Sequence, residues 1–185
     1  FATTLNGDSI VVTIDGSSVY INNAMVTAAD IMTDNGIVHV IDAVITPGST
    51  VYEVVAGSAD HNTLEAAIVA ASLQGTLSGS GPFTVFAPTD AAFEALPEGL
   101  VTSLLADPKG ELTQILLYHV VGGKVMSSDL SDGMTATTLE GADITVTISG
   151  SDVFINNARV IVADIETDNG IVHVIDAVIT PSTGI

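Results

Sequence analysis

Three acidic side chains stand at every second residue in Asp164-Ile-Glu166-Thr-Asp168, a spacing that could place oxygen ligands around a cation. Calcium-binding loops use this spacing, with glycine at the sixth place and a bidentate glutamate at the twelfth. Here Gly170 falls at the seventh place, and Ile175 stands where the glutamate would be. We therefore expect a strand that enters a hairpin, and calcium held by Asp164, Glu166 and Asp168 remains the alternative.

Histidine is the next candidate ligand, at positions 39, 61, 119 and 173. None of the four stands one helical turn from another, as zinc-binding helices require. The chain has no cysteine, which excludes thiolate ligands and thiolate nucleophiles. A G-x-S-x-G motif is absent, and the glycine-rich stretch 75–81 lacks the lysine of a phosphate-binding loop. We expect no metal at these histidines, no cofactor and no enzyme activity.

The balance of charge limits the partners. The sequence has 22 acidic and 3 basic residues, for a net charge of -19. So few cations cannot neutralise a nucleic acid, and anionic membrane surfaces are disfavoured for the same reason. No apolar run approaches the roughly 18 residues that span a bilayer, so we expect no membrane insertion. Partners should be neutral, cationic or bridged by cations.

An internal repeat is the main feature of the sequence. Residues 2–47 recur without a gap at 136–181, and 35 of the 46 aligned residues are identical. The period predicts a complete unit at 48–181, followed by a tail or the start of a linker at 182–185. Residues 1–47 then correspond to the C-terminal, strand-rich third of a preceding unit.

Helical patterns fill the first two thirds of the complete unit. We expect Asn62, with Glu65 three residues on, to begin a helix, and Asp107 followed by Pro108 to begin another that ends near Tyr118. The other expected elements are helical stretches at 51–75, 90–96 and 99–106 and a short strand at 84–87. The residues expected in the core are Phe83, Phe86, Phe93, Leu116 and Ile175.

The last third alternates apolar and polar residues, as in Ile144–Ile148 and Val153–Ile155. Such alternation is typical of half-buried strands, and the Asn169-Gly170 pair is a strong hairpin signal. Helices followed by antiparallel strands predict an α+β domain.

Three motifs resemble the signatures of fasciclin domains. Phe83-Thr-Val-Phe-Ala-Pro-Thr-Asp-Ala-Ala-Phe93 is similar to the first signature, Tyr118-His119 to the tyrosine-histidine motif, and Asn169–Pro181 to the second signature. The resemblance covers 48–181 and implies a β-wedge of mostly antiparallel strands with several packed helices. It also implies a secreted or surface-anchored adhesion protein.

The resemblance makes Tyr118 and His119 candidate contacts for cell-surface receptors. The alternative is that the pair fixes the fold through side-chain hydrogen bonds, as Tyr and His at a helix-to-strand junction commonly do.

We therefore expect an extracellular structural or adhesive protein of tandem fasciclin repeats, acting through contacts between units or subunits, as in a fibre, biofilm or matrix. A cell-surface receptor or a glycan is a further expected partner. The main alternative is a binding module for a small apolar or glycan ligand in a cleft between helices and sheet. The apolar face of residues 1–47 is expected to be covered either from upstream in a longer polypeptide or by another subunit.

Overall fold

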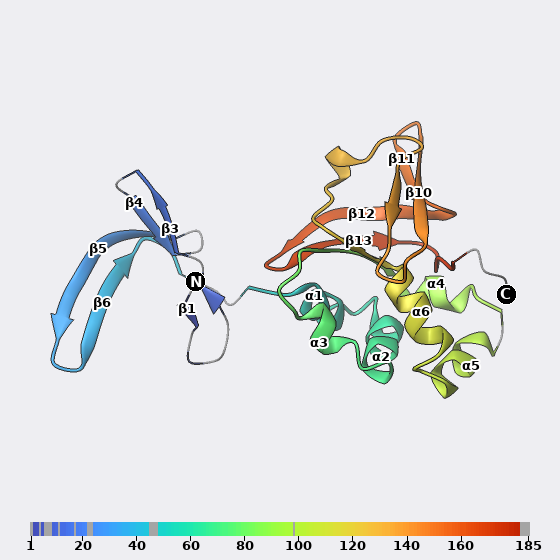
Figure 1. Cartoon of the computed structure of the whole chain (residues 1–185), viewed down its shortest axis with the longest axis horizontal. Helices are drawn as coiled ribbons and strands as arrows, with labels where there is room; N and C mark the ends of the chain where they lie inside the picture. The colour runs from blue at the N-terminus through green and yellow to red at the C-terminus, as the bar shows by residue number, and fades with distance from the viewer. Residues whose placement is uncertain are drawn as a thin grey trace. The chain divides into compact units, whose positions relative to one another are not determined.

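The computed structural model describes residues 2–181 apart from residues 4, 6–8, 11, 17, 22–23, 45–47 and 98. The chain divides into two compact units, Phe1–Gly48 (unit 1) and Ser49–Ile185 (unit 2). Each unit has its own sheet, drawn in blue for unit 1 and in yellow to red for most of unit 2 in Figure 1.

Unit 2 begins with a helical lobe, which we call the first lobe (residues 49–134). Its helices are α1 (Val51–Ala56), α2 (Asn62–Ala70), α3 (Gln74–Leu77), α4 (Asp90–Glu94), α5 (Leu100–Ala106) and α6 (Glu111–Tyr118). Its strands are β7 (Phe83–Pro88) and β8 (Val120–Gly122), and the short helix η1 spans Ser127–Asp129. The six α-helices lie together along one side of the sheet (Figure 1).

The second lobe of unit 2 (residues 135–181) supplies the rest of the sheet. Its strands are β9 (Thr135–Thr137), β10 (Asp143–Ser149), β11 (Asp152–Ile155), β12 (Ala158–Thr167) and β13 (Gly170–Ile175). The strand order is β8-β7-β13-β12-β11-β10-β9, and β7 pairs with β13 in parallel while the other neighbours are antiparallel. The two lobes therefore meet along β7 and β13, and the α+β prediction is confirmed.

Several helix boundaries differ from the sequence prediction. The stretch 51–75 forms three short helices, because left-handed Ser72 and the 57–61 turn interrupt it. The predicted start at Asp107-Pro108 is wrong: those residues turn after α5, with the Gly110 N–H donating to the Asp107 oxygen. The missed start is at Thr50, whose side chain and that of Glu53 form a capping box for α1.

The α2 N-terminus is capped from a distance. Asn62 does begin the helix, but neither it nor His61 provides a side-chain cap. The carboxylate of Asp90, at the start of α4, instead accepts hydrogen bonds from the N–H groups of Thr63 (2.7 Å) and Asn62 (3.3 Å). The Thr63 hydrogen bond is the main reason that the pKa of Asp90 falls to about 2. Tertiary contact replaces the local cap that the sequence pattern suggested.

Two apolar clusters form the core of unit 2. One lies between the helices and the sheet and includes Phe93 and Leu116, and the other includes Phe86 and Ile175. These four residues are buried, as expected from the sequence. Phe83 is half-buried, because it begins β7 at the end of the sheet.

Unit 1 repeats the strands of the second lobe. Its described strands pair in the order β3 (Val12–Asp15), β4 (Ser18–Ile21), β5 (Ala24–Thr33), β6 (Gly36–Ile41), and β1 (Ala2–Thr3) pairs with β2 (Ser9–Ile10). The pairings match those of unit 2, down to the two register shifts in the long β5 hairpin. The described residues of unit 1 contain no helix.

Candidate functional site

Tyr118 ends helix α6 and lies inside unit 2. Its hydroxyl donates a hydrogen bond to the main-chain oxygen of Asp143 and accepts one from Asn156 Nδ2, both at 2.9 Å. The side chain is 1% exposed. Tyr118 thus ties the last helix of the first lobe to β10 and to the turn after β11.

His119 is buried beside it and has partners at both ring nitrogens. Nδ1 lies 2.7 Å from the Ile115 carbonyl oxygen, which can only accept, so this nitrogen carries the proton. Nε2 accepts a hydrogen bond from the Ile179 N–H at 3.1 Å. Burial lowers the pKa of His119 from 6.5 to about 4, so the ring is neutral at physiological pH.

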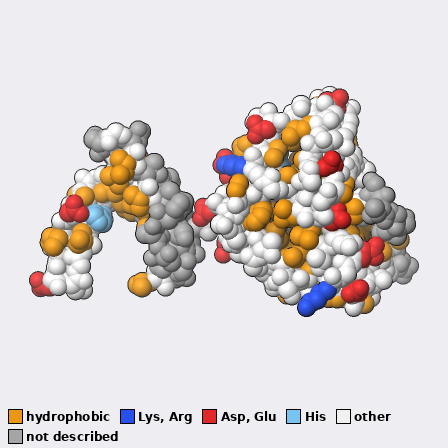
Figure 2. Space-filling model, viewed as in Figure 1, with side chains coloured by type: hydrophobic (Ala, Val, Ile, Leu, Met, Phe, Trp, Pro, Cys, Tyr) orange, Lys and Arg blue, Asp and Glu red, His pale blue; other side chains and the backbone are white. Residues whose placement is uncertain are grey.

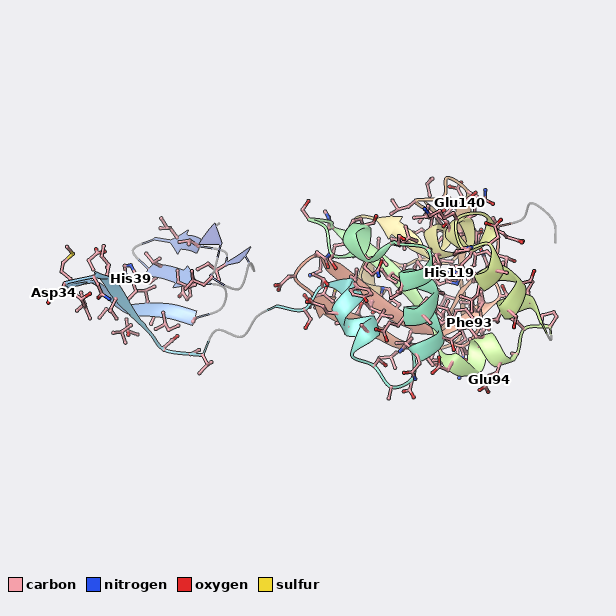
Figure 3. The ribbon with its side chains drawn as sticks, turned by 90° about the horizontal axis from the view of Figure 1, so that it is seen from below. Asp34, His39, Phe93, Glu94, His119 and Glu140 are labelled. Carbon is pink, nitrogen blue, oxygen red and sulfur yellow. The ribbon has the colours of Figure 1, made fainter. Side chains whose placement is uncertain are left out.

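The predicted site residues therefore lie in the interior of unit 2. His119 is labelled in Figure 3. Their hydrogen bonds join the two lobes, which fits the alternative that the pair fixes the fold. A role for Tyr118 and His119 in adhesion stays a prediction, and it would act through the surface that they support.

The three alternating carboxylates do not converge. Asp164 accepts hydrogen bonds from the N–H and the hydroxyl of Ser127, which lower its pKa, and Glu166 pairs with Lys124 at 2.7 Å. Asp168 is exposed. Within the described residues, no group of three His, Cys, Asp or Glu side chains is placed to hold a metal ion. Asp164 and Glu166 instead contact the first lobe.

His173 belongs to the same contact between the lobes. Its Nδ1 accepts from the Asp164 N–H at 3.3 Å, its Nε2 donates to the Val125 oxygen at 2.9 Å, and its ring stacks on Phe86 with centroids 5.6 Å apart. Asp164 adopts a positive φ of 59° at a register shift between β12 and β13, and its carboxylate accepts a hydrogen bond from the Ser127 N–H.

Asn169 is the residue whose role the sequence prediction missed. Its Oδ1 accepts from the Val51 N–H at 2.8 Å, and its Nδ2 donates to the Leu77 and Gly79 oxygens at 2.8 and 2.7 Å. One buried amide thus connects β13 to two helices of the first lobe. The Asn169-Gly170 pair predicts a hairpin and begins the stretch that resembles the second signature, but neither pattern indicates an amide that contacts the helices. The available signal is that the Thr-Asp-Asn-Gly stretch is identical in both copies.

A serine and a histidine also meet in the turn before α2. Ser58 Oγ lies 2.7 Å from His61 Nδ1, as in a nucleophile and its base. In a hydrolytic triad, the ring nitrogen that does not contact the serine donates a hydrogen bond to a carboxylate, which orients the ring. His61 Nε2 is buried and has no hydrogen-bond partner among the described residues, so the arrangement is not a triad.

The apolar space between helices and sheet is small. A cavity of about 10 Å³ lies among Leu64, Ile68, Phe86 and Leu116, next to His119. That is space for about one water molecule, which is far below the few hundred Å³ of a typical ligand pocket. This cavity therefore has no room for a small apolar ligand in the described structure.

Acidic residues outnumber basic ones by 22 to 3 in the sequence, and acidic side chains are spread over the face of unit 2 that Figure 2 draws. Figure 2 shows carboxylates scattered over unit 2, with small groups of hydrophobic side chains between them and few basic ones. No helix in the described part of the chain is both long and apolar enough to cross a membrane.

Comparison with known proteins identifies relatives. A protein-family model described as the fasciclin domain matches residues 1–47 and 59–181. Protein sll1483 of Synechocystis sp. is 48% identical over 133 residues, which cover 71% of this chain and 73% of that protein. The cell surface glycolipoprotein MPB83 of Mycobacterium bovis is 44% identical over 110 residues, which cover 60% of this chain and 48% of that protein.

A solved structure has the same fold. A FAS1 domain pair from the insect cell adhesion molecule fasciclin I matches with a TM-score of 0.63 and 24% sequence identity, covering 92% of this chain and 66% of that one.

Proposed function

Because this chain belongs to the fasciclin domain family, we propose that it is an extracellular or cell-surface protein that acts in adhesion through contacts between fasciclin units. The name of a relative supports the location, since MPB83 is a cell surface glycolipoprotein. A tandem array, as in a fibre or matrix, is the form that the repeat in the sequence favours.

The observation that carries this proposal is that the polar side chains of the candidate site make hydrogen bonds inside unit 2. Tyr118, His119, Asp164, Asn169 and His173 each have at least one side-chain hydrogen bond that joins the two lobes of unit 2. A catalytic group needs an accessible atom within reach of a substrate. With these groups engaged internally, the surface of a rigid scaffold is what remains to make contacts, and we expect no catalysis.

Charge sets the class of partner. With a net charge of -19, two copies repel each other, and neutral, cationic or cation-bridged surfaces are favoured. Such partners include neutral glycans, receptors with basic patches and other fasciclin units brought close by salt or divalent ions.

Beads coated with the chain provide the test. Aggregation of the coated beads, or their retention on a cell or glycan surface, should exceed that of uncoated beads and be inhibited by free chain in solution. Beads that stay dispersed and bind none of these surfaces, with and without calcium, would contradict an adhesive role.

A small apolar or glycan ligand is the second candidate function. It requires the cavity beside His119 to open well beyond about 10 Å³. A ligand-dependent rise in the melting temperature of the chain would support this alternative, because a ligand that binds only the folded state stabilises it.

A further inference from the structure

One stretch of sequence occurs in two different environments. Residues 33–47 are identical to residues 167–181. In unit 2, Ile171 and Val172 on β13 are 0% and 1% exposed, whereas the equivalent Ile37 and Val38 on β6 are 54% and 46% exposed. Figure 2 shows hydrophobic side chains beside the histidine of unit 1. A large exposed apolar surface normally finds a partner.

Unit 2 shows what covers this surface. Strand β7 lies along the edge of β13 in parallel, from Gly170 opposite Phe83 to Ile175 opposite Pro88, and helix α1 packs against β13. In unit 1, β6 is the edge strand of the described sheet, so its outer main-chain groups are available for another strand.

The polar groups that bind the first lobe are also present in unit 1. Asp30 has a φ of 57°, and its N–H donates to His39 Nδ1 at 3.3 Å, as Asp164 does to His173. In unit 2 the remaining groups of this pair bind Ser127 and the Val125 oxygen. The described residues of unit 1 supply no such partners, and His39 and Asp34 are labelled on unit 1 in Figure 3.

The glycine that begins β6 and β13 leaves space for a neighbouring strand at the sheet edge. A Cβ at Gly170 would collide with the main-chain oxygen of Phe83, so the close approach of β7 requires glycine there. Gly36 occupies the same place in unit 1, where a Cβ would meet nothing within 4 Å. In unit 1, a glycine becomes necessary at position 36 only when a strand equivalent to β7 lies beside β6.

We propose that β6 and the adjoining face of β5 form a docking surface for another fasciclin first lobe, a partner with the chemistry of residues 49–134. The partner adds a strand like β7 beside β6 in parallel, and its segment equivalent to 123–127 contacts Asp30 and His39. This deepens the proposed function, on which it rests, by naming the partner of one surface.

Two other occupants fit less well. The first lobe at residues 49–134 is already engaged, since β7 lies between β8 and β13. A second copy could offer its own β6 edge, but unit 1 contains five aspartates and neither Lys nor Arg, so two such faces would repel each other. A first lobe with a strand like β7 would pair with the main chain of β6 and would also supply hydrogen-bond partners for Asp30 and His39.

One substitution indicates which first lobe is preferred. The residue of unit 1 equivalent to Glu166 is Met32, which is 75% exposed. In unit 2, Glu166 forms an ion pair with Lys124. Methionine gains nothing from an ammonium group but packs well against irregular apolar surface. The partner of unit 1 should therefore carry an apolar side chain where Lys124 stands in this chain.

The first arm of the test uses the chain and a synthetic peptide of residues 82–90. Hydrogen exchange of the amides at 36–41 should slow saturably with added peptide, whereas the amides at 170–175, already paired with β7, serve as the internal control. A peptide of the same composition in scrambled order should have no effect. The Gly36→Ala variant should lose the peptide response while keeping the exchange pattern of unit 1.

The second arm uses an extended chain in which residues 49–134 are placed directly before residue 1, the junction found between residues 134 and 135. Exchange at 36–41 should slow by at least about 100-fold, toward that at 170–175, and Gly36→Ala should abolish this gain. The Lys124→Leu change in the added copy alone should preserve or increase the protection.

Three outcomes would overturn the proposal. Exchange of the 36–41 amides that does not slow in either arm would show that no first lobe docks there. Protection in the unmodified chain that rises with its concentration would assign the surface to a second copy, and protection only with phosphatidylcholine vesicles would assign it to a lipid surface. Bead adhesion can fail while the exchange results hold, so this inference and the proposed function are tested separately.

Discussion

The main-chain N–H of Ile179 donates a hydrogen bond of 3.1 Å to Nε2 of His119, although 60 residues separate them. Nδ1 of the same ring donates to the Ile115 oxygen. The imidazole thus holds the end of the second lobe against α6, and it does so only in its neutral form, because a protonated Nε2 cannot accept. Folding of unit 2 is therefore coupled to the protonation of one histidine.

Acid should destabilise unit 2 through His119. Its pKa is about 4 in the folded state against 6.5 for the ordinary group, so the unfolded chain binds the proton more tightly. The stabilisation is complete above about pH 6.5 and falls as the pH drops toward 4, by about 3 kcal/mol in total. Urea unfolding at a series of pH values measures this. The His119→Gln variant should show a shallower slope in that window, and an unchanged slope would contradict the assignment.

Removal of a core aromatic should be costly. Phe86 is 2% exposed and stacks on His173, so Phe86→Ala loses both contacts and leaves a cavity. We expect a loss of about 3–5 kcal/mol in the free energy of unfolding. Phe83→Ala is the matched control on the same strand, and it should cost less because Phe83 is half-buried. A Phe86→Ala protein that melts within a degree or two of the parent would show that the core assignment is wrong.

Asn169 and Asn35 form a matched pair with identical sequence surroundings. Asn169→Ala leaves the Val51 N–H and the Leu77 and Gly79 oxygens without their partner, and unsatisfied buried groups cost about 1–3 kcal/mol each. The three costs are not additive, because the surrounding structure relaxes. We therefore expect a total loss of about 3 kcal/mol in the free energy of unfolding. Asn35 is exposed, and Asn35→Ala should change the stability by less than about 0.5 kcal/mol. Equal effects in denaturant unfolding would mean that these hydrogen bonds do not hold the lobes together.

Association between copies should depend on salt. At a net charge of -19 the copies repel, and screening shortens that repulsion from about 30 Å at 0.01 M salt to about 8 Å at 0.15 M. Light scattering should therefore show association rising with ionic strength, and rising further with calcium at constant ionic strength. Scattering that is indifferent to both would exclude contacts controlled by charge.

The sequence alone predicted the strands and their turns, although not every helix boundary. Alternating residues predicted the strands, and the duplicated stretch predicted that unit 1 repeats the strands of the second lobe, because strand register and turns depend on neighbouring residues. The structure has the same pairings in both copies, and even the positive φ of Asp30 recurs at Asp164. The α+β order and the motifs that resemble fasciclin signatures likewise come from short stretches of chain.

Tertiary structure decided the environment of those residues. Ile37 and Ile171 have the same neighbours in sequence, yet one is 54% and the other 0% exposed, since only the second has a first lobe packed on it. The same applies to the cap of α2, which Asp90 provides from 28 residues away. Sequence periodicity shows which face of a strand is apolar, but burial and hydrogen-bond partners depend on segments distant in the chain. That is why identical residues are a core in unit 2 and a surface in unit 1.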